Sequence, residues 1–112
     1  MKNETPLEDY EQISLVNELL RRHPDLLLEI NPAAGMKLTP RQGAQVKRLG
    51  YQAGTLDIFI PEWHVYIELK RQKGGKLTDK QAQRIPKLMA AGYQVLVAKG
   101  ALDAIDQLQA IG

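Results

Sequence analysis

The sequence contains no cysteine, and only one tryptophan and one phenylalanine among its 112 residues. Without cysteine the chain can form no disulfide, no thiolate metal site and no cysteine nucleophile. No apolar run approaches the length of a bilayer, and acidic residues interrupt the N-terminal segment where a signal peptide would be apolar. We therefore expect a protein without membrane segments, located in a reducing cytoplasm.

An excess of charge of one sign is also lacking. The formal net charge of +2 is too small to indicate nucleic-acid binding by itself. Basic residues do cluster locally, in RRH at 21–23, KR at 47–48 and KRQKGGK at 70–76. Such clusters are most often solvated surface, so they need supporting evidence. The length and the ordinary composition predict one domain over residues 1–112.

Apolar spacing and capping residues predict helices at 8–22, 39–49, 78–92 and 101–111. The apolar stripe of the first is expected to comprise Ile13, Val16, Leu19 and Leu20. Thr39 and Thr78 are predicted N-caps of the second and third helices. Pro86 lies inside the third, where it predicts a kink or a break.

Short apolar runs bounded by turn residues predict strands at 25–30, 55–60, 64–70 and 93–98. Only the tripeptide PEW separates the second strand from the third, so these two should form a hairpin. The third helix then connects the hairpin to the last strand. This order predicts an α/β fold in which helices pack on the faces of a small mixed sheet.

The predicted hairpin carries charged residues on the face opposite its buried one. Side chains alternate across a strand, so Glu68 and Lys70 share one face while Leu69 faces the core. Neighbouring strands lie about 5 Å apart, which allows Asp57 on the preceding strand to approach Glu68. Two carboxylates this close repel each other unless a cation lies between them, and Mg²⁺ prefers such oxygen ligands. We therefore predict a metal site that the Leu69 carbonyl completes, with Lys70 assisting a water or a phosphate.

The alternative interpretation of these residues is an ordinary one. Asp57 could be a turn residue, and Glu68 and Lys70 could be an exposed pair on a hairpin. A D…ExK pattern is short enough to arise by chance, so it needs support from the rest of the chain.

That support comes from five segments: EDYEQ, LGYQAGTLDIFIP, YIELK, GGKLTDKQ and AAGYQVLVAKG. Together they resemble the virus-type replication-repair nuclease (VRR-NUC) domain, a branch of the PD-(D/E)xK nuclease superfamily. The resemblance covers nearly the whole chain. It implies a restriction-endonuclease-like α/β/α sandwich and Mg²⁺- or Mn²⁺-dependent hydrolysis of DNA phosphodiester bonds. Standalone members occur in phages and prophages and are similar to Holliday-junction resolvases, which implies a homodimer acting on branched DNA in the cytoplasm of a bacterial host.

The resemblance also implies roles for individual residues. Asp57 and Glu68 match the metal-binding acids, and Lys70 matches the catalytic lysine. Gln81 matches a glutamine on the following helix that orients the lysine or a phosphate. One position departs from the family, because Leu56 stands where a proline usually precedes the aspartate. The rival interpretation is therefore a catalytically silent DNA-binding or scaffold module on the same fold.

The family also has a glutamate on its first helix, and both Glu8 and Glu11 match it. At 100° per residue, Glu8 lies near the stripe of Val16 and Leu19, whereas Glu11 points well away from it. We therefore expect Glu8 to be the further metal ligand. In the basic run after the hairpin, Lys73 and Lys76 are expected to contact DNA phosphates beside the site.

Overall fold

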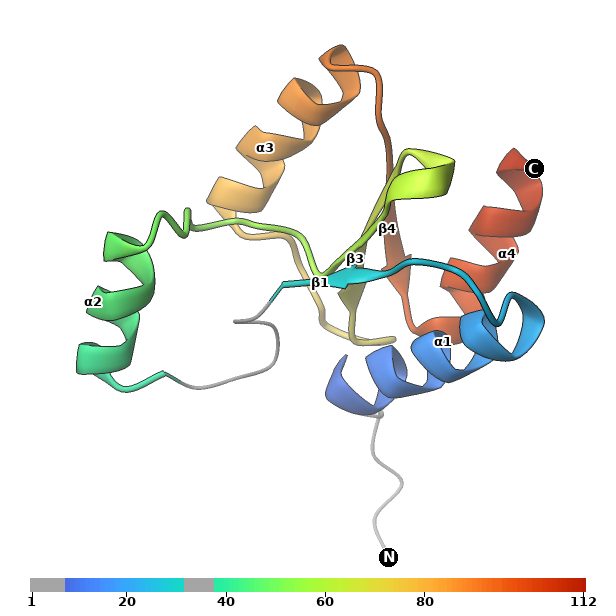
Figure 1. Cartoon of the computed structure of the whole chain (residues 1–112), viewed down its shortest axis with the longest axis horizontal. Coiled ribbons are helices and arrows are strands. Elements are labelled where there is room, and N and C mark those ends of the chain that lie inside the picture. The colour runs from blue at the N-terminus through green and yellow to red at the C-terminus, as the bar shows by residue number, and fades with distance from the viewer. Residues whose placement is uncertain (1–7, 32–37) are drawn as a thin grey trace, which may run out of the picture.

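The structure, a computed structural model, describes residues 8–31 and 38–112. Its elements are α1 (Glu8–Arg22), β1 (Glu29–Ile30), α2 (Pro40–Arg48), β2 (Ile58–Ile60), a 3-10 turn (Pro61–Trp63), β3 (Val65–Lys70), α3 (Asp79–Ala90), β4 (Gln94–Lys99) and α4 (Ala101–Ile111) (Figure 1). The predicted order of helices and strands is confirmed, although β1 is only two residues long. The turn residues NPAAG at 31–35, which bound the first predicted strand, lie outside the described residues from residue 32 on. Within the described ranges, no helix is long and apolar enough to cross a membrane.

The strands form a sheet in the order β1-β2-β3-β4. β1 pairs with β2 and β2 with β3 in antiparallel fashion, whereas β3 and β4 are parallel. β2 and β3 are the predicted hairpin, and α3 supplies the long connection that a parallel pair requires. The prediction of a small mixed sheet is therefore confirmed.

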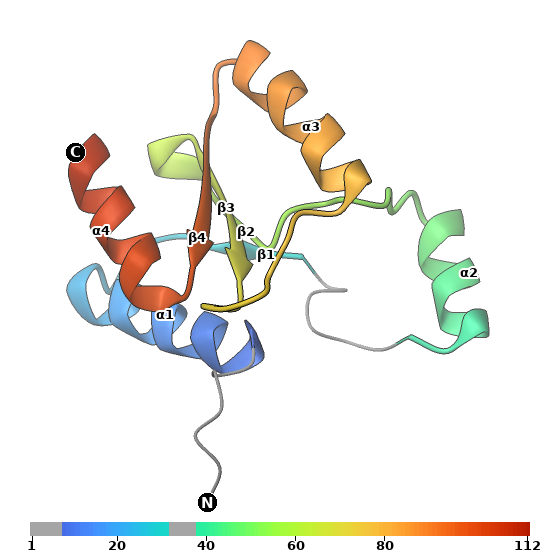
Figure 2. The ribbon, with the colours of Figure 1, turned by 180° about the vertical axis from the view of Figure 1, so that it is seen from behind.

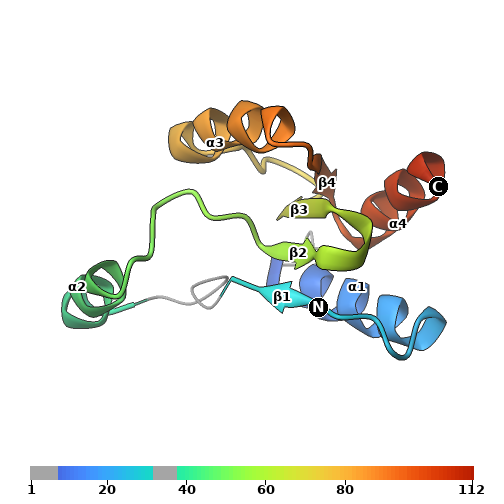
Figure 3. The same ribbon diagram turned by 45° about the horizontal axis from the view of Figure 1, so that its top comes forward.

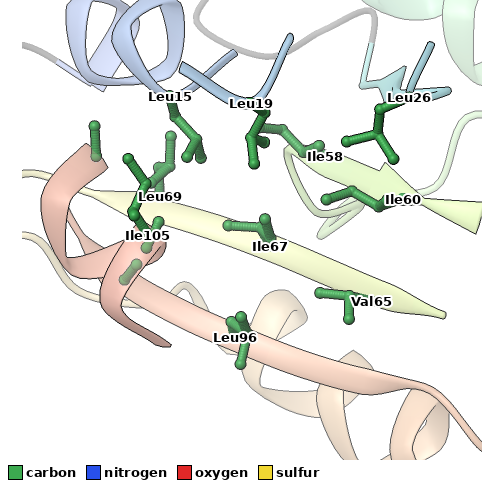
Figure 4. Close-up of a cluster of buried hydrophobic side chains, with 13 residues drawn as sticks. Leu15, Leu19, Leu26, Ile58, Ile60, Val65, Ile67, Leu69, Leu96 and Ile105 are labelled. Carbon is green, nitrogen blue, oxygen red and sulfur yellow. The ribbon is translucent and has the colours of Figure 1, made fainter. Parts of the chain in front are cut away.

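Helices lie on both faces of this sheet. α1 and α4 cover one face, and α3 lies on the other side, against β4 (Figures 2 and 3). The core fills the space between the sheet, α1 and α4 (Figure 4), and its larger side chains are Leu15, Leu19, Leu26, Ile58, Ile60, Val65, Ile67, Leu69, Leu96 and Ile105. α2 stands apart from the sheet, and none of its residues, all of which are described, is buried.

The predicted apolar stripe of α1 is only half correct. Leu19 is buried and Val16 packs against the core, as predicted. Ile13 and Leu20 are instead 55% and 37% exposed, and Leu15, outside the predicted stripe, is fully buried. Apolar residues occur on several sides of this helix, so more than one stripe is compatible with helical spacing. The position of α1 against β3 and α4 selects the face that contains Leu15, and spacing alone does not reveal that position.

α3 continues without a break through Pro86, so a broken helix was the wrong expectation. Proline removes the hydrogen bond to the carbonyl four residues earlier, which belongs to Ala82. Both Pro86 and Ala82 are exposed. Water can therefore satisfy the freed carbonyl, which lowers the cost of keeping proline in this surface helix.

Candidate active site

The antiparallel register of β2 and β3 brings Asp57, which directly precedes β2, next to Glu68 on β3. The Asp57 amide donates a hydrogen bond to Glu68 Oε1 at 3.2 Å. In return, the Leu69 amide donates to Asp57 Oδ2 at 2.8 Å. The two carboxylates predicted to converge therefore lie side by side at one end of the hairpin.

Glu68 and Lys70 form a buried ion pair. Their residues are only 2% and 7% exposed, and Lys70 Nζ lies 3.1 Å from Glu68 Oε2. The alternative of an ordinary exposed pair on a hairpin is therefore wrong. Removing two charges from water is costly, so a buried pair of this kind is weak evidence of a stabilising role. Buried, closely coupled ionisable groups are typical of functional sites.

Gln81 connects this pair to α3. It occupies the third position of the helix in a capping box with Thr78, whose backbone N–H donates to Gln81 Oε1 at 3.0 Å. The same Oε1 accepts a 3.0 Å hydrogen bond from Lys70 Nζ, and Gln81 Nε2 donates to Glu68 Oε2 at 2.7 Å. One amide thus fixes both the start of the helix and the positions of the lysine and the glutamate.

A comparison with Gln42 separates the site contacts of Gln81 from its capping role. Gln42 closes an equivalent capping box with Thr39 on α2 and has no part in the candidate site. We expect Gln42→Ala to cost about 0.5–1 kcal/mol of unfolding free energy. Gln81→Ala should cost about 1–3 kcal/mol more, since it also removes the hydrogen bonds that Gln81 makes to the buried side chains of Glu68 and Lys70. Urea denaturation of both variants measures the difference, and equal losses would contradict the contacts assigned to Gln81.

The environment of Glu68 changes its ionisation. Burial and, to a smaller extent, the adjacent Asp57 carboxylate raise the pKa of this carboxyl from 4.5 to about 7, against the opposing effect of the Lys70 ammonium. A cation between the two acids would relieve this repulsion. Among the described residues, no cluster of three or more histidine, cysteine, aspartate or glutamate side chains could hold a metal ion. The donors present are two carboxylates and nearby backbone oxygens, a set that suits Mg²⁺ or Mn²⁺ with waters in the remaining positions.

The structure corrects the expectation for Glu11. This residue is 7% exposed, and so it points inward and not away from the core. Its Oε1 accepts a 3.0 Å hydrogen bond from the Ala101 amide, and its Oε2 accepts one of 2.6 Å from Gln72 Nε2. Glu11 therefore caps the first turn of α4 and anchors the segment that follows β3. The side chain of Glu8 lies outside the described part, so its role as a metal ligand stays a prediction.

The basic segment after β3 turns back over the site. A Cβ added to Gly75 would lie 2.8 Å from both the Cβ of Lys70 and the amide nitrogen of Arg71. Only glycine allows this close approach. Lys73 and Lys76 flank this turn and are exposed.

A cavity of about 600 Å³ lies elsewhere, beside Trp63 and the first residue of β3, Val65. None of the described candidate site residues lines it. The candidate site lies at the other end of β3. It is therefore identified by the chemistry of its residues and not by a cavity.

Fold and site together define an α/β protein with an open mixed sheet and an acid–lysine–glutamine cluster on its hairpin. The fold is similar to that of a solved structure described as "VRR_NUC domain protein", with a TM-score of 0.76 and 28% sequence identity. The alignment covers 95% of this chain and 88% of the other. No protein-family profile and no curated protein matches the chain. The structural likeness confirms the resemblance to the VRR-NUC domain that the sequence predicts, and the fold is consistent with a nuclease domain of that type.

Proposed function

We propose that the chain is a metal-dependent endonuclease that hydrolyses DNA phosphodiester bonds. The observation that carries this proposal is the buried network of Glu68, Lys70 and Gln81 beside Asp57. Its residues are those that the family pattern assigns to catalysis, and they are in contact although 13 positions separate Glu68 from Gln81. Burying an ion pair costs desolvation free energy without a reliable gain in stability, so its presence favours a catalytic role over a purely structural one.

Asp57 and Glu68 would hold the Mg²⁺ or Mn²⁺ ion, with the Leu69 carbonyl and Glu8 as further proposed ligands. Within an antiparallel ladder the N–H and C=O of one residue point to the same neighbouring strand. Since the Leu69 amide donates to Asp57, its carbonyl is expected on the same side. A cation bound there would supply Lewis-acid activation of the attacking water and of the phosphate.

Lys70 would act on the phosphate or on the attacking water. Its ammonium group has three protons, and contacts with Glu68 and Gln81 use two of them. The third can donate to a phosphate oxygen, where the fixed positive charge stabilises the negative charge that develops during hydrolysis. Gln81 would be a positioning residue, since it holds Lys70 from the side of α3.

The substrate we propose is branched DNA such as a four-way junction, cut by a homodimer. Symmetric cutting of a junction requires two sites, which a twofold dimer provides. Lys73 and Lys76 would contact phosphates beside each site. A second subunit also adds phosphate contacts to a chain whose net charge is only +2.

The test is cleavage of end-labelled four-way junction, flap and linear duplex DNA in Mg²⁺, Mn²⁺ or EDTA, with sedimentation analysis of the protein. We expect metal-dependent cutting of the junction by a dimer. Cutting of the flap or the duplex alone would preserve the nuclease but refute the proposed substrate. If every substrate is bound and none is cut, the silent DNA-binding module is the better description, with Leu56 as a sign of divergence from the family pattern.

A further inference from the structure

Aromatic rings gather on the outer face of the hairpin. Phe59 on β2 and Tyr66 on β3 are register partners and stack with ring centroids 4.3 Å apart. Tyr93, just before β4, packs edge-on against both, at 5.6 Å from Phe59 and 5.3 Å from Tyr66. These three rings form one continuous cluster, which we call the aromatic row.

The aromatic row continues the candidate active site along the same strands. Phe59 is two residues from Asp57, and Tyr66 is two residues from Glu68, so alternation places all four side chains on one face. Two residues correspond to about 7 Å along a strand. Ile58 and Ile67, which separate these residues, face the opposite side and are fully buried in the core.

The hydrophobic core does not account for the aromatic row. Among the described residues, the core cluster between the sheet, α1 and α4 includes none of the three rings. Phe59, Tyr66 and Tyr93 are each partly exposed. α3, the helix on this side of the sheet, packs mainly at β4, and none of its residues, all of them described, is buried. The helix therefore leaves ring surface open to solvent.

Positive charge lies along the same side. α3 presents Lys80, Arg84 and Lys87 at helical spacing, and Arg84 Nη2 lies 3.4 Å from the Ala53 carbonyl, on the segment that leads into β2. Burial raises the pKa of the Tyr66 hydroxyl, the nearby charge of Arg84 opposes this shift, and the carboxylate of Glu29 adds to it. The exposed acid Glu29 pairs with Phe59 at the edge strand, away from α3. Aromatic faces bordered by cations are complementary to a nucleotide, which offers a ring and a phosphate.

We propose that the aromatic row stacks an unpaired nucleobase next to the scissile phosphate, while Arg84 attracts the adjoining backbone. This inference rests on the proposed nuclease function and narrows its substrate. A base inside a duplex has both faces covered by its neighbours, so protein rings can stack only on bases that are unpaired or splayed out. The preferred DNA would then carry single-stranded nucleotides at the cleavage site, as in flaps or opened junctions.

The test uses the full chain and DNA that carries 2-aminopurine, a base whose fluorescence is quenched by stacking. The probe base is placed either in a single-stranded arm or in the duplex part of the same DNA, with EDTA present to prevent cleavage. We expect the protein to quench the probe in the arm and not in the duplex. Phe59→Leu and Tyr66→Leu should abolish this quenching and weaken binding of the armed DNA by about 5- to 100-fold. Binding of fully paired duplex should change little.

Two further variants separate stacking from folding. Tyr66→Phe keeps the ring and should preserve quenching, and Tyr10→Leu removes a 64% exposed ring from α1 and should leave binding unchanged. Melting temperatures show whether each variant is folded. If a leucine variant unfolds, quenching of the arm probe and not of the duplex probe by the unmodified protein is the test of base stacking. DNA binding without quenching in the arm, or equal loss of duplex and arm binding in the leucine variants, would refute base stacking on the aromatic row. The proposed nuclease function would be unaffected. Absence of all DNA binding would refute both.

Discussion

Lys70→Ala is expected to lower the rate of DNA cleavage by about 10²- to 10⁴-fold, the range typical of losing a positioned acid–base or electrostatic group. In the folded protein the Lys70 ammonium lies between Glu68 Oε2 and Gln81 Oε1, so its charge is fixed where we propose the phosphate binds. Alanine removes that charge and leaves both acids in place. Single-turnover cleavage in Mn²⁺ measures the loss, and fluorescence anisotropy in EDTA measures DNA binding, which should largely persist.

The matched control is Lys99→Ala. Lys99 is the register partner of Lys70 on the neighbouring parallel strand, but it is exposed and belongs to no part of the proposed site. Its loss should leave the cleavage rate close to that of the unmodified protein. Lys70→Met preserves most of the buried stem and should be as inactive as Lys70→Ala, which covers the case in which alanine unfolds the chain. Retained cleavage in a folded Lys70 variant would remove the proposed mechanism.

The parts of the fold that were predictable from sequence depend on interactions between near neighbours. The Thr39 and Thr78 N-caps each have a glutamine three residues later, and such capping boxes form within one helical turn. The hairpin is equally local, because the four-residue connection at 61–64 fixes the register of its strands. The approach of Asp57 to Glu68 follows from that register, so the centre of the candidate site could be predicted before the structure was known.

The parts that were not predictable depend on how distant elements pack. Glu11, Leu15 and Leu19 follow one another at intervals of four residues, a spacing compatible with burial, but so are several other combinations in this helix. Only the packing of α1 against α4 brings Glu11 to the Ala101 amide, 90 positions away along the chain. The contacts of Glu68 and Lys70 with Gln81 likewise depend on where α3 begins relative to β3, and the hairpin sequence carries no signal of this position.

Metal binding is expected to depend steeply on pH because Glu68 must release a proton first. Its pKa is about 7 in the folded chain and 4.5 when unperturbed. Below about pH 7 the apparent Mn²⁺ affinity should fall by roughly tenfold per pH unit, since one proton competes with the metal. The rise in melting temperature that Mn²⁺ produces should therefore be large at pH 8.5 and small at pH 5.5.

The raised pKa of Glu68 makes the stability of the metal-free protein fall with pH, whereas stabilisation by Mn²⁺ should rise with pH. Between about pH 4.5 and pH 7 the unfolded chain loses the Glu68 proton while the folded chain keeps it, so the unfolding free energy falls as pH rises through this window. The difference between the two pKa values corresponds to at most about 3 kcal/mol. Glu68→Gln removes the titrating group, and its stability relative to the unmodified protein should increase with pH over this window. Glu62→Gln, the same change at an exposed position, should not reproduce this trend.

For the metal-binding test, a Mn²⁺-induced rise in melting temperature of equal size at pH 5.5 and pH 8.5 would show that Glu68 is not a ligand.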